Sequence, residues 1–424
     1  MFELCILLIT FCGIILGKCK YNNFVNPLAS FNIVWFIVSL MMIKGNPTIN
    51  EPTIMAKSCV LIGVFAFNIA NLMPFYKISL IYKKYKFGNA LQHDYVLNLK
   101  LLHILSIFVI VYSIYNAIDA IQYTINGGAL ADVRNEFYSY DNTNTPFKYY
   151  FDTYVFSPIR YIVIVGTIVG YFFVKEERLL LLNCFLIILL QGMQSAGRYV
   201  FFNTILMIFC CFALTKKASS LKVKSKKIIF IFVPILITVI LGITANRTTI
   251  ATDNITFVGQ LWETIYSYFV GSITYMGVVN ESYPFIKSST FGINFIAGFL
   301  SPFFAGLTFF NLISYPDFLK VVGTYACEQL PIGDIYFNAM PTIFMYYYID
   351  FGYIGVFIET YIFGRICYLA YRNICINENL LYVSFYILIF VQICVSSTRW
   401  FFYSSDFALA FIYIWLIFKR KRVN

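Results

Sequence analysis

Long apolar blocks alternate with short charged segments along the whole chain. Each block is roughly 20 residues long, which is the length that an α-helix needs to cross the hydrocarbon core of a membrane. A chain inside a bilayer must satisfy its own backbone hydrogen bonds, and blocks of this length favour helices over barrel strands. The pattern predicts eleven spans, at residues 2–17, 25–43, 58–76, 99–118, 153–174, 179–196, 199–215, 228–245, 352–371, 380–397 and 402–418.

Composition leads to the same class of protein. Of the 424 residues, 60% are hydrophobic and only 12% are charged, and the mean hydropathy is +0.75. Soluble domains carry about 25% charged residues, and a water-soluble fold does not hide this much apolar surface. The chain is therefore predicted to be an all-α, polytopic integral membrane protein with about 11 (10–13) transmembrane helices.

The distribution of lysine and arginine predicts the orientation. Basic loops resist translocation and stay in the cytoplasm, and they all fall on one side if the N-terminus is outside and the C-terminus is cytoplasmic. The cytoplasmic side then carries a net charge of +16 and the outer side −5, which gives the +11 of the chain. The positive charge thus reflects topology and does not indicate a nucleic-acid partner. Residues 1–4 lack a basic region, so no cleaved signal peptide is predicted.

Two segments on the predicted outer face are too long to be turns, residues 119–152 and 246–351. The second contains semi-apolar stretches, which we interpret as helices at the membrane surface or as a further hairpin of spans. No soluble appendage or repeat is evident, so residues 1–424 are predicted to form a single polytopic membrane domain. Because binding residues concentrate on loops, we expect function on the outer face.

Sequence motifs for cofactors and metals are missing. The chain lacks GxxxxGK[ST], GxGxxG, HExxH and Asp-x-Asp, and its two histidines lie in or beside a predicted cytoplasmic loop. No cofactor, no metal and no outer histidine-based triad is therefore predicted. Asp350-Phe351-Gly352 matches a kinase triplet, but the rest of that signature is missing and the match is attributed to chance. The glycine pairs in GIILG and GTIVG have the small-xxx-small spacing that is typical of helix packing.

Arginines gather at the predicted outer ends of helices. A single arginine there is explained by a side chain that reaches the lipid headgroups. Five together, on the face poorest in positive charge, favour an anion site, because guanidinium offers a fixed fork of donors for phosphate. The five are Arg134, Arg160, Arg198, Arg247 and Arg399. Arg198 is the best candidate, since it lies in QSAGR, a turn with almost no loop between two spans.

Four stretches, taken in order, resemble the bacterial oligosaccharide repeat-unit polymerases, the Wzy type that builds O-antigen and capsule. They are QSAGRYVFFNTIL, ADVRNEFYSY, YSYFVGSITYMGVVNESYP and NAMPTIFMYYYIDFGYIGVFIETYIFGRICYLAYR. The resemblance implies a GT-C-like helical fold, long outer loops and pyrophosphate-binding roles for Arg134, Arg198 and Arg247. It also implies undecaprenyl-pyrophosphate-linked oligosaccharides as substrates, within the bacterial plasma membrane. A chain-length regulator and a flippase would be further partners.

The implied enzyme transfers a growing glycan from its lipid pyrophosphate to a sugar hydroxyl on a second lipid-linked unit. Arginines that stabilise the leaving pyrophosphate make a metal unnecessary. An outer carboxylate is the natural general base, with Glu281 first and Asp253 next, followed by Glu263 and Asp334. Tyr275 and Tyr283 are the candidates for stacking on sugars, within a larger set of outer tyrosines that a membrane-interface belt mostly explains. That set is Tyr266, Tyr268, Tyr275, Tyr283, Tyr346, Tyr347 and Tyr348.

Two alternatives stay open at this point. One is a lipid-linked oligosaccharide flippase or another transporter, which is not an enzyme. Transporters usually show repeats and polar residues at mid-membrane, whereas charges here lie at span ends, except for Glu359 and Arg365, which do not pair well with each other. The other alternative is an O-antigen ligase-type transferase. Ligases depend on an outer-loop histidine, and its absence here favours the polymerase.

Overall fold

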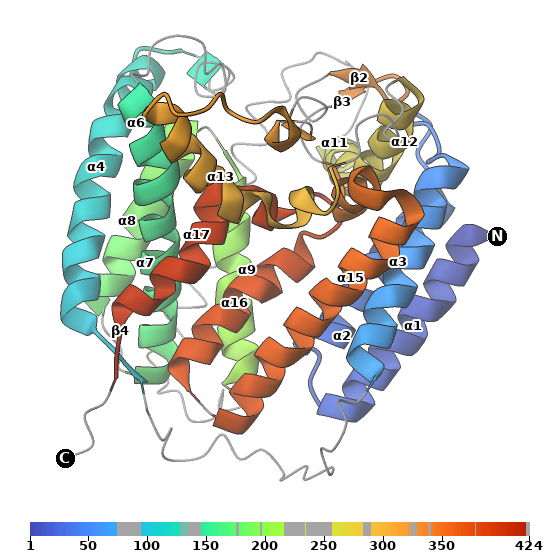
Figure 1. Cartoon of the computed structure of the whole chain (residues 1–424), viewed down its shortest axis with the longest axis horizontal. Coiled ribbons are helices and arrows are strands. Elements are labelled where there is room, and N and C mark those ends of the chain that lie inside the picture. Colours follow the sequence, from blue (N-terminus) through green and yellow to red (C-terminus); the bar gives the residue numbers. More distant parts are fainter. Residues whose placement is uncertain are drawn as a thin grey trace. The chain divides into compact units, whose positions relative to one another are not determined.

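The computed structural model describes most of the chain (Figure 1). The described residues are 1–73, 95–128, 132–133, 146–174, 178–195, 197–215, 234, 257–282, 290–320, 322–323, 329–337, 341–377 and 379–420. Most of them are helical, and the strands found among them form two short two-stranded sheets. Seven helices of this part are long and apolar enough to cross a membrane, by length and composition. A helical membrane protein is therefore what the structure supports, while the total of eleven spans stays a prediction.

Contacts divide the chain into two compact units. Unit 1 comprises Met1–Lys86, Ile255–Cys375 and Gln392–Ala408, and unit 2 comprises Phe87–Asn254, Ile376–Val391 and Leu409–Asn424. Three of the points where the chain passes from one unit to the other lie inside helices, namely α15 (Ile343–Asn377), α16 (Leu380–Cys394) and α17 (Ser405–Tyr413). Neither the units nor their boundary tests the prediction of a single membrane domain.

Unit 1 begins with three long helices, α1 (Phe2–Tyr21), α2 (Pro27–Lys44) and α3 (Ile54–Leu72), which lie side by side (Figure 1). Its other elements follow in chain order. They are α11 (Phe257–Tyr266), η3 (Ser267–Gly271), α12 (Ser272–Ser282), α13 (Ile293–Phe309), η5 (Asp317–Leu319), β2 (Leu330–Pro331), β3 (Tyr336–Phe337), α15 (Ile343–Asn377) and η6 (Phe401–Tyr403).

Close packing and paired amides hold α1, α2 and α3 together. A Cβ atom on Gly13 of α1 would lie 2.4 Å from the Asn32 side chain of α2, so only glycine admits this approach. Asn32 in turn exchanges amide hydrogen bonds with Asn68 of α3, at 2.6 and 3.2 Å. Buried amides that satisfy each other are favourable in an apolar interior. The predicted packing role of the first glycine pair is confirmed.

Basic side chains close one end of α3. Lys20 donates to the carbonyl oxygen of Asn71 at 2.8 Å, and Arg365 donates to those of Ala70 and Met73 at 2.6 and 2.9 Å. The last carbonyl groups of a helix lack partners and carry partial negative charge, so cations are stabilising there. Arg365 is therefore explained by helix capping.

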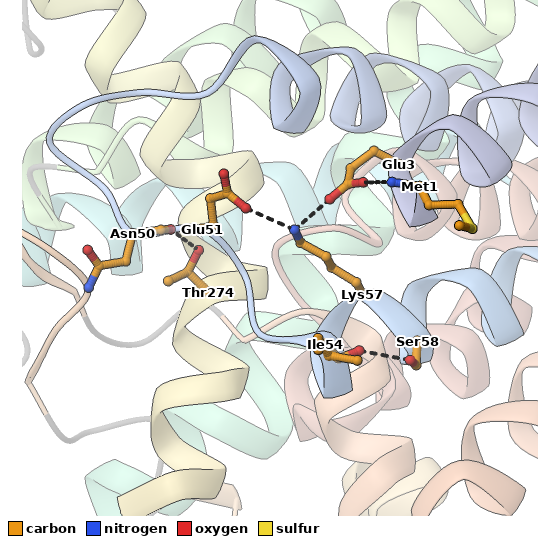
Figure 2. A network of polar contacts seen from close by, with 8 residues as sticks. All are labelled: Met1, Glu3, Asn50, Glu51, Ile54, Lys57, Ser58 and Thr274. Atoms are coloured by element: carbon orange, nitrogen blue, oxygen red, sulfur yellow. Dashed lines mark hydrogen bonds and ion pairs between the residues drawn. The ribbon is translucent and has the colours of Figure 1, made fainter.

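The opposite end of α3 carries a polar network (Figure 2). Lys57 forms ion pairs with Glu3 of α1 at 2.5 Å and with Glu51 at 3.1 Å. Beside it, Thr274 of α12 donates to the backbone carbonyl of Asn50 at 3.0 Å. The start of α1 and the start of α3 thus lie at one end of unit 1, which agrees with the predicted direction of the first three spans.

Unit 2 consists mainly of four helical segments. Its elements are β1 (Tyr95–Leu97), α4 (Leu99–Ile125), α6 (Pro146–Phe151), η1 (Asp152–Phe156), α7 (Ser157–Val169), η2 (Gly170–Val174), α8 (Arg178–Ser195), α9 (Tyr199–Leu214), η7 (Ile414–Ile417) and β4 (Phe418–Arg420). Helices α4 and α8 pack together, and α7 contacts α4, α8 and α9. Strand β1 pairs with β4 in antiparallel register, with Tyr95 opposite Arg420. Gly166 of α7 lies against Leu102 and Ile417, where a Cβ atom would be 3.0 and 2.7 Å from their side chains.

Several predicted boundaries move in the structure. Helix α15 begins at Ile343 and not at residue 352, so the end of the second predicted outer segment is helical and buried. The first predicted outer segment is also partly helical, because α4 continues to Ile125 and α6 begins at Pro146. Except for Pro234, the predicted span 228–245 lies outside the described residues.

Helix α15 is broken near its beginning. Phe351 has φ −145° and ψ 25°, and Gly352 has φ +62° and ψ −144°, so the helical path is interrupted at these two residues. Glycine adopts a positive φ without steric cost. Just after the break, Gly355 packs against the backbone of Tyr347, where a Cβ atom would lie 2.2 Å from the carbonyl oxygen. The two parts of α15 are therefore in close contact at the break.

Candidate anion site and a buried carboxyl pair

Arg198 lies directly at the start of α9. Helix α8 ends at Ser195 and α9 begins at Tyr199, which confirms the predicted turn with almost no loop. The carbonyl oxygen of Arg198 accepts the first hydrogen bond of α9, from the Phe202 amide at 3.2 Å. Gly192 lets the two helices approach at this end, because a Cβ atom there would lie 2.3 Å from the Phe201 ring. The half-buried Arg198 is thus carried by a rigid turn.

Arg160 lies in the first turn of α7, behind Pro158, and its side chain is largely buried, with 9% of the residue exposed. Its Nη2 donates to the Ser157 hydroxyl at 3.4 Å, and its guanidinium lies 5.6 Å from the centre of the Phe156 ring. Burial of a guanidinium is costly unless hydrogen bonds and charge compensate it. The sequence predicts Arg160 in or beside a helix end, whereas the structure places it within the continuous helix Phe147–Val174 and buries it.

Topology brings these two arginines to the same end of unit 2. The connections from η2 to α8 and from α8 to α9 are short, and short connections join antiparallel neighbours. Helix α9 therefore runs in the same direction as α7, with which it is in contact. Arg198 lies at the beginning of α9, where free backbone N–H groups and the helix dipole favour an anion. Arg160 lies within a helix that runs on from α6 and η1 into α7, so it adds a cation but no helix N-terminus.

Arg399 belongs to unit 1 and lies on a turn after α16. The side chain of the buried Gln392 holds this turn from both sides: it donates to the Arg399 carbonyl at 3.1 Å and accepts from the Phe401 amide at 2.7 Å. The Arg399 amide also donates to the Val395 carbonyl at 3.0 Å. Sequence reasoning missed Gln392, although a glutamine at the end of an apolar span is a signal for such a role.

Neighbouring elements also hold the turn at Ser396. Its hydroxyl accepts from the Trp35 indole of α2 at 3.1 Å, and its carbonyl accepts from the Ile343 amide of α15 at 3.1 Å. Trp400 is buried in an aromatic cluster and donates to the Phe295 carbonyl at 3.2 Å. The backbone that carries Arg399 is therefore preorganised.

The remaining predicted site residues divide into three groups. Arg134, Arg247, Asp253 and Tyr283 lie outside the described residues. Glu281 is exposed in the last turn of α12, and Asp334 is exposed beside β3, so both carboxylates are accessible. Glu263 is half-buried in α11.

Tyrosines that were interpreted as outer aromatics are core residues. Tyr275 is fully buried in α12, and its ring lies 5.5 Å from that of Phe337. A ring packed in this way is not presented to a sugar, and Tyr275 is not retained in the site. Four other tyrosines are also buried and therefore do not belong to a membrane-interface belt, namely Tyr266, Tyr346, Tyr347 and Tyr348. Three of these lie in the helical residues 343–350, which the sequence pattern had assigned to a loop.

Two buried carboxyl groups of α15 form a second polar centre. Asp350 has 0% and Glu359 3% of its surface exposed, and their carboxyl groups lie within hydrogen-bonding reach of each other. Asp350 also accepts from the Thr290 hydroxyl and, at 3.3 Å, from the Asn294 amide at the start of α13. Asp350 had been assigned to a loop and to a chance motif, and the structure corrects the loop assignment. The signal that could have found it is a carboxylate beside two glycines in an apolar stretch.

Neither the comparison of the chain with known proteins nor the arrangement of its metal-ligating side chains assigns a function. No family model, curated protein or solved structure matches the chain. Among the described residues, no group of three or more His, Cys, Asp or Glu side chains could hold a metal ion. The chemistry of the chain is therefore argued from its own residues.

Proposed function

We propose that the chain is a glycosyltransferase that polymerises undecaprenyl-pyrophosphate-linked oligosaccharide repeat units into O-antigen or capsule. The observation that carries the proposal is the pair of Arg198, at the beginning of α9, and Arg160, on the neighbouring parallel helix α7. Guanidinium groups bind phosphate oxygens through paired hydrogen bonds, and helix N-termini add further donors. A lipid-linked pyrophosphate supplies an anion of suitable charge at a membrane surface. By resemblance, Arg134 and Arg247 contribute to the same site.

In the proposed reaction a hydroxyl of one lipid-linked repeat unit attacks the anomeric carbon of the growing glycan. The bond from that carbon to the phosphate oxygen breaks, and the lipid pyrophosphate leaves with the electron pair. Negative charge grows on the leaving group, and preorganised arginines stabilise that charge more strongly in the transition state than before it. The proton of the attacking hydroxyl passes to a carboxylate, for which Glu281 is the first candidate among the described residues because it is exposed.

Arg399 of unit 1 is proposed as an anion-binding residue in its own right, because its turn is rigid. An arginine loses conformational freedom when it binds an anion, and this loss weakens binding. At Arg399 the loss is smaller, because Gln392 and Ser396 already hold the backbone of the turn in one conformation. Rigid support of this kind is typical of binding groups and is not needed for a side chain that only reaches the headgroups.

One observation favours the flippase or transporter as a second candidate. Helix α15 is broken beside two buried carboxyl groups, and broken helices with buried charged residues are typical of transport pathways. A transporter moves the lipid-linked unit across the membrane without making a glycosidic bond. The two candidates therefore differ in their products.

A reconstituted assay separates them. Purified full-length protein in liposomes, supplied with lipid-linked repeat units on the accessible side, is expected to produce a ladder of longer glycans on a gel. The ladder is expected to persist in EDTA, because arginines replace the metal. Units that only change leaflet, with no bond formed, would reject the polymerase, and activity lost in EDTA and restored by Mg²⁺ would reject the metal-independent mechanism.

A further inference from the structure

Two cationic side chains converge on the C-terminal end of α3. Lys20 of α1 donates to the carbonyl oxygen of Asn71 at 2.8 Å. Arg365 of α15 donates to the carbonyl oxygens of Ala70 and Met73 at 2.6 and 2.9 Å. The end of a helix carries about half an elementary negative charge, whereas the two side chains bring two full positive charges. Capping therefore explains where they lie, but the helix end compensates only a part of their charge.

The ring of Tyr368 holds the same two cations close to each other. The Nζ atom of Lys20 lies 5.2 Å from the centre of this ring, and the guanidinium group of Arg365 lies 4.9 Å from it. Cations are attracted to the face of an aromatic ring, so the half-buried Tyr368 fixes where both charges lie. Like charges at such short range repel each other, and an anion beside both of them relieves that repulsion.

The chain around these residues is basic as well. Residues 16–26, 64–73 and 361–377, which include this end of α1, α3 and α15, contain four basic side chains and no acidic one. The other two basic side chains are Lys18 and Arg372, and all four are half-buried, so each is partly accessible. The predicted topology places this end at the cytoplasmic leaflet, whose anionic lipids attract clusters of basic side chains.

An exposed apolar face beside the cations favours a lipid over a free phosphate ion. On α15, Ile358, Ile362 and Ile366 are 46, 41 and 39% exposed. They are four positions apart, so they lie on one face of the helix. This face ends one residue beyond Arg365, so an acyl chain along it would have its headgroup at the level of the cations. A free phosphate ion would make no use of this face.

We propose that Lys20 and Arg365, beside the ring of Tyr368, bind the phosphate group of one anionic phospholipid at the predicted cytoplasmic end of unit 1. The phosphate oxygens accept charge-assisted hydrogen bonds from the two side chains, and an acyl chain lies along the exposed isoleucines of α15. The site goes beyond the proposed polymerase activity, which is assigned to the opposite face of the membrane. Its test therefore does not depend on whether the chain makes polymer.

Native mass spectrometry of the purified full-length protein in detergent tests the site, with phosphatidylglycerol as the anionic probe and phosphatidylcholine as the neutral one. Each basic group near an anionic headgroup contributes about a factor of five in affinity, so the first phosphatidylglycerol is expected to bind about tenfold more tightly or better. Lys20→Gln is expected to lower this preference about fivefold, and Lys20→Arg is expected to keep it. The matched control Lys100→Gln alters an exposed lysine at the predicted cytoplasmic end of unit 2 and is expected to leave the preference unchanged.

The unaltered protein alone can overturn the proposal, even if a variant folds poorly. Equal affinity for the two lipids would reject an anion site at this end of unit 1. Displacement of phosphatidylglycerol by an equal concentration of inorganic phosphate would also overturn the proposal, because that result would identify a site for a free ion. Tyr368→Leu is a second variant that leaves the hydrogen bonds to α3 in place and is expected to lower the preference. An unchanged preference in both Lys20→Gln and Tyr368→Leu would reject the site as well.

Discussion

The arginine-bearing end of unit 2 and the α13–α15 region of unit 1 handle charge in opposite ways. In unit 2, the half-buried Arg198 lies at the beginning of α9, where the chain turns, and Arg160 lies on the neighbouring helix α7. In unit 1, Asp350 and Glu359 lie within the length of α15 and are almost completely buried. We propose that the first arrangement binds an external anion, whereas the second lies inside the protein.

The difference shows how position along a helix decides what a charged residue can do. At a helix end, free backbone groups and water share the cost of the charge. Inside a span, the charge needs a partner that the fold itself must bring close. A short turn is therefore enough to place the charge of Arg198. The buried carboxyl groups of Asp350 and Glu359 instead need the break in α15 and the start of α13 to bring polar partners close.

The largest expected effect is on activity at the unit 2 end. Arg198→Ala is expected to lower polymer formation by on the order of 10²-fold, as the loss of one transition-state donor typically does. Arg198→Lys should rescue activity only in part, because a point charge does not reproduce the guanidinium fork. Arg178→Ala, at the other end of α8, is the matched control and should leave polymer formation unchanged. Gel analysis of polymer length and immunoblotting of protein level measure both quantities.

Failure of this prediction would remove the functional difference between the two regions. Full activity in Arg198→Lys would leave Arg198 as a helix-end anchor that any long cationic side chain replaces. The unit 2 end would then have only a structural role.

The next largest effect concerns the packing that places α13 in unit 1. A Cβ atom on Gly298 would lie 2.5 Å from the Phe402 carbonyl oxygen and 2.7 Å from that of Ser404, and backbone atoms cannot easily move away. Gly298→Ala is therefore expected to destabilise the protein by about 1–3 kcal/mol, the usual cost of overpacking. Gly306→Ala on the same helix meets no atom within 4 Å and is the control. Thermal unfolding in detergent measures the difference, and equal stability of the two variants would contradict the prediction.

A smaller effect is expected where the rigid turn carries Arg399. Gln392→Leu removes both side-chain hydrogen bonds to the turn and leaves the Phe401 amide without this partner. Loss of a buried partner costs about 1–2 kcal/mol, and activity should fall as well if Arg399 binds the substrate. Thr398→Ala, which loses one local bond to the Val395 carbonyl, is the control. A stable Gln392→Leu variant with full activity would argue against the role of the turn.

The smallest effect is expected at the polar network in Figure 2. The Glu51 side chain is 85% exposed, whereas that of Glu3 is 17% exposed, although both bind Lys57. Exposed ion pairs contribute about 0–1 kcal/mol, so Glu51→Gln should change stability little and Glu3→Gln more. Thermal unfolding at low and high salt tests this order. The reverse order would show that exposure does not govern the strength of these pairs.

Much of the chain could be predicted because the relevant signals are local. Apolar blocks define the helices, and QSAGR places Arg198 between two helices because a helix ends where small and polar residues interrupt the block. The glycine pair of α1 indicates close packing because the spacing of small residues is a property of one helix. These features depend on residues that are near one another in the sequence.

Only the tertiary structure decided the other features, and the physical reason is the same for each. Residues nine apart on one helix cannot meet unless the helix breaks, so the pattern alone argues against pairing Asp350 with Glu359. The sequence pattern alone suggests that Tyr275 and Tyr347 are interface aromatics, whereas in the structure both are buried by segments that are distant in the sequence. Gln392 acts on a turn that α2 and the start of α15 hold in place. The sequence by itself determined the helices, the distribution of charge and the arginine turn, whereas long-range packing decided which polar groups are buried and what they contact.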